Sequence, residues 1–146
     1  MLEVRYLLKK EPMAKTALYS SPYGLLQGSF TEDDYLCRLN FCSGKTDGLP
    51  DIGTVTCLTL YGTEFCHRVW QELLALPRNK TLSYSELARN CNLKGVRSVA
   101  AAVAKNPIAY LVPCHLIIRK DCSLGGYRWG AALKKQILER EANAKF

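Results

Sequence analysis

Residues 83–107 carry the sequence SYSELARNCNLKGVRSVAAAVAKNP. Ser83 followed three residues later by Glu86 is a capping-box pattern, in which the two side chains satisfy free backbone amides at the start of a helix. Residues 90–94 break this first helix, and a second helix of mostly small side chains follows from Gly95 and ends before a proline. A short helix, a tight break and a second helix predict a helix-turn-helix.

The second helix of this pair is thin. Four of its positions are alanine, and Arg97 is its one long basic side chain near the start. A slim helix can come close to a nucleic-acid backbone or enter a narrow groove, which bulky side chains would prevent. Close packing against neighbouring helices explains the alanines equally well, so at this point both interpretations stay open.

Outside this pair, the pattern of the chain changes near residue 62. Upstream, short apolar runs between turn residues predict a short helix from Thr31 through Asp34, a loop at residues 44–53, and strands at residues 4–8, 15–20, 24–30 and 54–61. Downstream, apolar residues at helical spacing predict helices at residues 64–76 and 131–141. We therefore predict an α/β fold with a strand-rich domain over residues 1–61 and a helical domain over residues 62–146.

The charge of the chain is unevenly divided. Its net charge is +7, and residues 1–61 hold six Lys and Arg against seven Asp and Glu, whereas residues 62–146 hold fourteen against six. Basic charge on one part of a chain is typical of a polyanion partner. No run approaches the roughly 18 apolar residues of a membrane span. We expect no membrane partner and a place inside the cell, in the cytoplasm or nucleoid, or in the nucleus of a eukaryote.

The cysteines give no framework for disulfides or metal. The seven cysteines form an odd set without a CxxC pair, and only His67 and His115 supply imidazoles. A disulfide scaffold fits poorly without a secretory signal, and a structural zinc site fits poorly without paired ligands. We expect no metal and no cofactor, and we interpret most of the cysteines as small buried apolar residues.

One cysteine stands in a segment where reactive groups gather. Residues 106–115 are an apolar run held by two prolines that ends in Cys114 and His115. A thiolate is the reactive form of cysteine, and an imidazole oriented by a carboxylate promotes loss of the thiol proton. Glu141, on the predicted last helix, is the candidate for that orienting role. A cysteine, a histidine and a glutamate do not by themselves identify a reaction.

The motifs taken together resemble one family. Pro113-Cys114-His115 is similar to the acceptor-cysteine motif of the O6-alkylguanine-DNA alkyltransferases, also called methylated-DNA–protein-cysteine methyltransferases. Four further motifs follow the family in order and with nearly fixed spacing, between about residues 61 and 141. Residues 62–70 resemble the family's first helix, and residues 83–88 and 96–107 resemble the two parts of its helix-turn-helix. Residues 126–130 resemble an active-site loop like that of the bacterial adaptive-response alkyltransferases. The resemblance also implies a ribonuclease-H-like fold for the first domain.

The resemblance implies a self-alkylating repair reaction. Cys114 takes the alkyl group from O6 of guanine, His115 acts through a water as the base for the thiol, and Glu141 holds the imidazole in the useful tautomer. Tyr84 helps to rotate the nucleotide out of the duplex, because O6 lies inside a base pair. The product thioether is no leaving group, so the protein acts once.

The resemblance also implies which residues meet the substrate. The second helix enters the minor groove, Arg97 replaces the extruded nucleotide, and Asn106 stabilises the hinge behind that helix. The implied contacts with DNA come from Tyr84, Arg97, Ser98, Ala100 and Ala101, and the implied base pocket from Val112, Pro113, Tyr127, Arg128 and Trp129. The expected partner is double-stranded DNA containing O6-alkylguanine. We expect a monomer without an obligate protein partner.

The sequence departs from the family pattern at two places, and two alternative functions remain open. Leu116 stands where the family motif continues with arginine, and the spacing from Tyr84 to Arg97 is one residue shorter than in the family. One alternative is a non-enzymatic lesion sensor of the alkyltransferase-like type, although such proteins lack the acceptor cysteine. The other is an ordinary helix-turn-helix regulator, which has no need of the motifs after residue 106.

Overall fold

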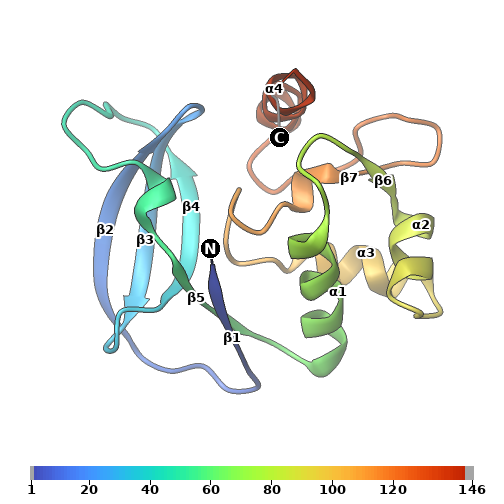
Figure 1. Ribbon diagram of the computed structural model, residues 1–146, viewed down its shortest axis with the longest axis horizontal. Helices are drawn as coiled ribbons and strands as arrows, with labels where there is room; N and C mark the ends of the chain where they lie inside the picture. Colours follow the sequence, from blue (N-terminus) through green and yellow to red (C-terminus); the bar gives the residue numbers. More distant parts are fainter. Residues whose placement is uncertain (1, 144–146) are drawn as a thin grey trace. The chain divides into compact units, whose positions relative to one another are not determined.

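The computed structural model describes residues 2–143, which form two compact units (Figure 1). One unit contains residues 2–64 together with Pro107–Ala109, and the other contains Phe65–Asn106 together with residues 110–143. The predicted α/β class is confirmed, with a β-sheet unit followed by a helical unit. The predicted domains 1–61 and 62–146 remain a prediction, since compactness does not measure independent folding. Within the described part of the chain, no helix has the length and apolar character to cross a membrane.

The first unit is built on a five-stranded sheet in the order β1-β5-β4-β3-β2. Its strands are β1 (Glu3–Leu7), β2 (Met13–Ser21), β3 (Gly24–Thr31), β4 (Leu36–Cys42) and β5 (Cys57–Tyr61). Strands β2, β3 and β4 form an antiparallel meander, and β5 runs parallel to both β4 and β1. The sheet buries apolar side chains completely, and each contributes about 1.5–3 kcal/mol; they include Leu26, Leu36, Leu39, Leu58 and Leu60.

The hairpin between β3 and β4 corrects one sequence-based expectation and contains a strand that the sequence did not predict. The predicted helix from Thr31 through Asp34 is wrong, because these residues make a tight turn in which the Thr31 amide donates to the Tyr35 carbonyl at 2.9 Å. Asp34 adopts a φ of +67°, a left-handed conformation that aspartate tolerates and that no regular helix contains. Strand β4 was not predicted, since its one exposed arginine interrupts a short run that is otherwise weakly alternating.

A short segment from far along the chain also belongs to this unit. Residues Pro107–Ala109 run parallel to β4 beside Leu39. The Leu39 amide donates to the Pro107 carbonyl and the Ala109 amide donates to the Leu39 carbonyl, each at 3.0 Å. Strand β5 pairs with β4 only through Leu36 and Leu58. The 107–109 segment therefore satisfies backbone groups of β4 beyond that single pairing.

The second unit is helical. Its helices are α1 (Glu64–Ala75), α2 (Tyr84–Asn90), α3 (Val96–Ala104) and α4 (Ala131–Ala142), and a two-stranded parallel ladder joins β6 (Leu82–Ser83) to β7 (Ile117–Ile118). Trp70 on α1 is 1% exposed, and its indole N–H donates to the Ala102 carbonyl of α3 at 2.9 Å. This bond and the burial of the indole pack α1 against α3.

The predicted capping box is present at the start of α2. The Ser83 hydroxyl accepts from the Glu86 amide at 3.1 Å, and the Glu86 carboxylate accepts from the Ser83 amide at 3.0 Å. After α2, Asn92 and Gly95 adopt φ values of +56° and +87°, which reverses the chain before α3 begins. The helix-turn-helix predicted from residues 83–107 is therefore formed by α2 and α3.

Replacement of Ser83 by alanine should lower the free energy of unfolding by about 1 kcal/mol, because the Glu86 amide loses its acceptor. Urea unfolding followed by circular dichroism measures this change. Ser85→Ala is the matched control, since Ser85 lies inside the helix and has no capping role, and it should change stability by less than about 0.5 kcal/mol. Equal effects of the two substitutions would contradict the capping account.

Candidate active site

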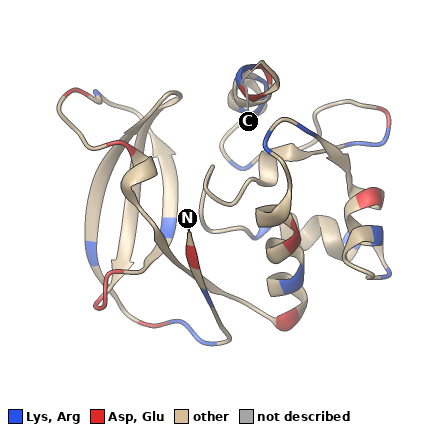
Figure 2. Cartoon of the chain, viewed as in Figure 1, with Lys and Arg blue, Asp and Glu red and all other residues tan. Residues whose placement is uncertain are grey.

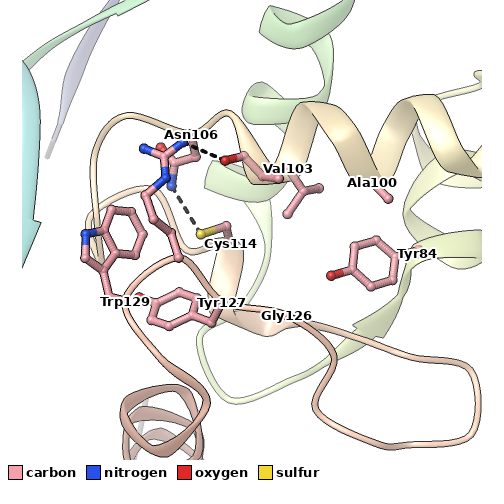
Figure 3. A pocket seen from close by; sticks show the side chains of 10 residues that line it. Tyr84, Ala100, Val103, Asn106, Cys114, Gly126, Tyr127 and Trp129 are labelled. Atoms are coloured by element: carbon pink, nitrogen blue, oxygen red, sulfur yellow. Dashed lines mark hydrogen bonds between the residues drawn. The ribbon is translucent and has the colours of Figure 1, made fainter.

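Cys114 lies at the floor of a small cavity in the second unit. It begins a single 3-10 turn, Cys114–Leu116, and its side chain is only 7% exposed. The cavity has a volume of about 180 Å³ and Figure 3 shows the side chains around it. They come from α2, α3 and the residue after its C-cap, the 3-10 turn and the segment before α4, and they comprise Tyr84, Ala100, Val103, Ala104, Asn106, Cys114, Gly126, Tyr127, Arg128 and Trp129.

Asn106 connects the end of α3 to the thiol. Its side chain is 1% exposed, and the amide nitrogen donates to the Val112 carbonyl at 3.0 Å and to the Cys114 sulfur at 3.3 Å. Its backbone amide donates to the Val103 carbonyl at 3.2 Å, in the last turn of α3. One buried residue is therefore bonded to the helix end through its backbone and to the sulfur through its side chain.

The electrostatics of the cavity keep the Cys114 thiol protonated at rest. Burial raises the pKa of Cys114, and the hydrogen bond from Asn106 opposes that rise, as do the more distant charges of Lys134 and Arg128. A buried thiol without a base nearby is inert. The site therefore needs a group that accepts the proton when the sulfur reacts.

His115 and Glu141 supply such a group. The His115 ring is fully buried, and its Nε2 lies 2.5 Å from a carboxylate oxygen of Glu141, which is 6% exposed. The carboxylate accepts a hydrogen bond, so Nε2 carries the proton and Nδ1 has the free lone pair; Nδ1 has no hydrogen-bond partner among the described residues. Burial lowers the pKa of His115 in spite of Glu141, so the ring is neutral at pH 7 and able to accept a proton.

Aromatic rings enclose the imidazole. The Tyr110 ring stacks on His115 at a centroid distance of 6.3 Å, and the Tyr127 ring meets its edge at 6.5 Å. Trp129 packs against Tyr127 at 5.2 Å, and both rings line the cavity. Tyr84 lies on the opposite side of the cavity from Trp129 (Figure 3). The walls are flat and largely apolar, as a stacked planar ring requires.

Lys134 is a site residue that the sequence analysis missed. Its side chain is fully buried, and the ammonium donates to the carbonyls of Ile117 at 2.6 Å, Leu124 at 2.5 Å and Gly126 at 3.3 Å. Burial lowers the pKa of Lys134 to about 8. Its place three residues before buried Ile137 and seven before buried Glu141 was the available signal, because these spacings share one helix face. Lys134 fastens the loop before α4 to the strand after Cys114.

Four of the five residues predicted to contact DNA lie on α3, and the fifth, Tyr84, is half-buried at the start of α2. Arg97, Ser98 and Ala101 are exposed, whereas Ala100 is half-buried and reaches the cavity. No Asp or Glu occurs between Glu86 and Asp121, a stretch that spans the turn, α3 and the cysteine. Figure 2 shows the Lys and Arg positions on the helices and loops of this unit. A narrow helix edge, with basic and no acidic residues on α3 or on the turn before it, is therefore accessible.

The remaining predicted pocket residues divide into two groups. Tyr127, Arg128 and Trp129 line the cavity as expected, and the Arg128 guanidinium donates to the Ala104 carbonyl at 2.7 Å. Val112 and Pro113 are buried and are not among the residues that line it. The Val112 carbonyl already accepts from Asn106 and from the Cys114 amide, so it supports the cysteine. Among the described residues, no group of His, Cys, Asp and Glu side chains has a geometry that could hold a metal ion.

Comparisons with known proteins show what the helical unit is similar to. Residues 64–143 match the family model described as 6-O-methylguanine DNA methyltransferase, DNA binding domain. Over 86 residues the chain is 46% identical to the bifunctional transcriptional activator/DNA repair enzyme Ada of Escherichia coli K12, a match that covers 58% of the chain and 24% of that relative. Over 85 residues it is 46% identical to the methylated-DNA–protein-cysteine methyltransferase of Mycobacterium leprae, with 58% and 52% covered.

A solved structure extends the similarity to both units. The crystal structure of Mycobacterium tuberculosis OGT in complex with DNA matches with a TM-score of 0.71 and 30% identity, covering 86% of this chain and 92% of that one. The matched part of the chain spans only about a quarter to a half of the length of the curated relatives. The family model matches the unit that carries Cys114.

Replacement of Lys134 by methionine should lower the free energy of unfolding by at least about 2 kcal/mol, because three carbonyls lose a buried charged donor. Thermal and urea unfolding measure the change. Lys135→Met is the matched control: Lys135 is exposed and pairs only with Glu139 at 3.9 Å, so its loss should change stability by less than about 0.5 kcal/mol. A Lys134→Met variant as stable as the control would show that Lys134 does not fasten the loop.

Proposed function

Since the chain belongs to the 6-O-methylguanine DNA methyltransferase family, we propose that it repairs DNA by direct reversal, moving an alkyl group from O6 of guanine to the sulfur of its own Cys114. The observation that carries the proposal is the hydrogen-bonded Cys114 thiol at the floor of a cavity, next in the chain to a neutral His115 oriented by Glu141. The lesion chemistry, the residue roles and the monomeric state are parts of this proposal.

The reaction is a displacement at the alkyl carbon. His115 takes the thiol proton at Nδ1, through a water, while Glu141 accepts from the Nε2 proton and stabilises the imidazolium that forms. The sulfur then forms a bond to the alkyl carbon as the carbon–O6 bond breaks, and the electron pair of that bond goes to the guanine. The proton held by His115 balances the charge when it passes to the guanine, which stays attached to its sugar as an unmodified base of the DNA strand.

The nucleotide must leave the duplex before the sulfur can reach it. Extrusion of a base requires a few kcal/mol, and less for a poorly paired, alkylated base. We assign to Tyr84 the rotation of the nucleotide. Arg97, exposed in the first turn of α3, then fills the space that the nucleotide leaves in the base stack. Ser98, Ala100 and Ala101 keep the edge of α3 thin, so that it fits the minor groove. Asn106 holds the hinge behind α3 and the sulfur together.

Positive charge around α3 supplies affinity for the phosphate backbone of DNA. Arg89, Lys94, Arg97 and Lys105 are exposed on α2, α3 and their connections. Contacts of such side chains with phosphates release counterions, so binding weakens as salt rises. The cavity and the α3 edge belong to the same unit of one chain, and we propose that a monomer acts on duplex DNA in the compartment that holds the DNA.

Duplex DNA with one O6-methylguanine should convert the protein to a form that carries a single methyl group. Intact mass should rise by one methyl per molecule, and peptide mapping should place it on the peptide containing Cys114. The protein should not turn over, because a thioether is no leaving group. Cys114→Ser is the control and should bind the lesion without gaining mass.

Two outcomes would contradict the proposal. Tight binding of lesion DNA without any gain in mass would indicate a lesion sensor, and Leu116→Arg would then be the first variant to make. Preference for one undamaged sequence over lesion DNA would indicate a helix-turn-helix regulator.

A further inference from the structure

Arg78 lies in the connection between α1 and β6, outside every motif described above. Its Nη1 donates to the Tyr110 carbonyl at 2.8 Å, and its Nη2 donates to the Leu111 carbonyl at 3.0 Å. Nη1 also lies 3.6 Å from the second carboxylate oxygen of Glu141. A planar guanidinium with fixed donors is suited to such simultaneous contacts, which a lysine ammonium cannot reproduce.

The two carbonyls belong to a backbone that needs support. Tyr110 adopts a φ of +65°, a left-handed conformation that is strained for a tyrosine. Its ring stacks on His115 with an interplanar angle of 18°, and the Arg78 guanidinium lies 5.3 Å from the centre of the same ring. Arg78 therefore holds the backbone conformation that places Tyr110 on one face of the imidazole.

The contact with Glu141 acts on the edge of the same imidazole. One carboxylate oxygen of Glu141 accepts from His115 Nε2, and the other faces Arg78. A carboxylate held at both oxygens cannot rotate freely, so it fixes the orientation and tautomer of the histidine that it contacts. Arg78 thus contacts both supports of His115, through a hydrogen bond to the Tyr110 carbonyl and an ion pair with the Glu141 carboxylate.

We propose that Arg78 is a positioning residue for His115, holding the imidazole with Nδ1 free to take the thiol proton by fixing Glu141 and the Tyr110 backbone together. The catalytic meaning of this inference rests on the proposed function. Arg78 touches neither the cavity nor the sulfur, so it acts through the other two side chains.

The charge of Arg78 has a separate, measurable effect. The groups that act on His115 are Glu141 and Lys134 from α4, Arg78 from the α1–β6 connection, and the Tyr110 and Tyr127 rings. Among these, the positive charge of Arg78 lowers the pKa of His115. The ring must be neutral to act as a base, and removal of this charge raises the pKa of His115. The acid limb of the pH–rate profile should therefore move to higher pH.

The test compares Arg78→Met with Lys80→Met, which removes an exposed positive charge from the same connection. The rate of methyl transfer from O6-methylguanine DNA is measured against pH, and DNA affinity is measured in the Cys114→Ser background. Nitrogen NMR of the imidazole gives the tautomer of His115, and His67 is the only other histidine in the sequence.

Arg78→Met should slow transfer at neutral pH by about tenfold or more, shift the acid limb upward and mix the His115 tautomers, with lesion affinity within about twofold of Lys80→Met. Arg78→Lys should restore only part of the rate, because lysine keeps the positive charge but lacks the paired donors of the guanidinium. A wild-type rate, pH profile and tautomer in Arg78→Met would overturn the proposal, as would an equal loss in Lys80→Met.

Two further results keep the inference separate from folding and from the proposed function. If Arg78→Met does not fold, Arg78→Lys decides: a reduced rate with mixed tautomers supports positioning, and a wild-type rate and tautomer refute it. If the wild-type protein transfers no methyl group, the proposed function fails. The NMR comparison of His115 in the variants then still decides whether Arg78 positions the ring.

Discussion

The structure of the site depends on the two hydrogen bonds that the buried Asn106 amide donates to the Val112 carbonyl and the Cys114 sulfur. Asn106 follows directly on the turn that ends α3, the helix with the exposed arginine, and precedes the segment that carries the cysteine. A buried amide left without partners would destabilise the fold, so this side chain has little freedom to move. The surface proposed to meet DNA and the atom proposed to react are therefore joined by one residue.

Around that residue, burial sets the protonation states. It raises the pKa of Cys114 and lowers the pKa of His115, so both the thiol and the imidazole are neutral at rest. A neutral pair needs less compensation in a dry cavity than a thiolate and an imidazolium would need. Charge then develops only as the proton moves, and Glu141, with Arg78 on its second oxygen, is already in place to stabilise it.

The parts of this arrangement that are local could be predicted from the sequence. The capping box of Ser83 and Glu86 and the helix pair depend on neighbours in the chain, and the family motifs located Cys114, His115 and Asn106. The parts that depend on tertiary contacts could not. Arg78 looks like an ordinary surface cation in the sequence, and the helical spacing of Lys134 does not say what it binds; only the folded chain brings the two to their carbonyls. The same limit explains the wrong helix at Thr31, where the pairing of β3 with β4 outweighs local capping preference.

The most direct test of the Asn106 link is the pH dependence of alkylation of each cysteine by iodoacetamide, followed by peptide mapping. In Asn106→Leu, which fills a similar volume without a donor, the pKa of Cys114 should rise, and its alkylation curve should move to higher pH. The curves of the exposed Cys42 and Cys122 should stay where they are in the wild type. An unchanged curve for Cys114 would contradict the claim that the Asn106 amide holds the sulfur.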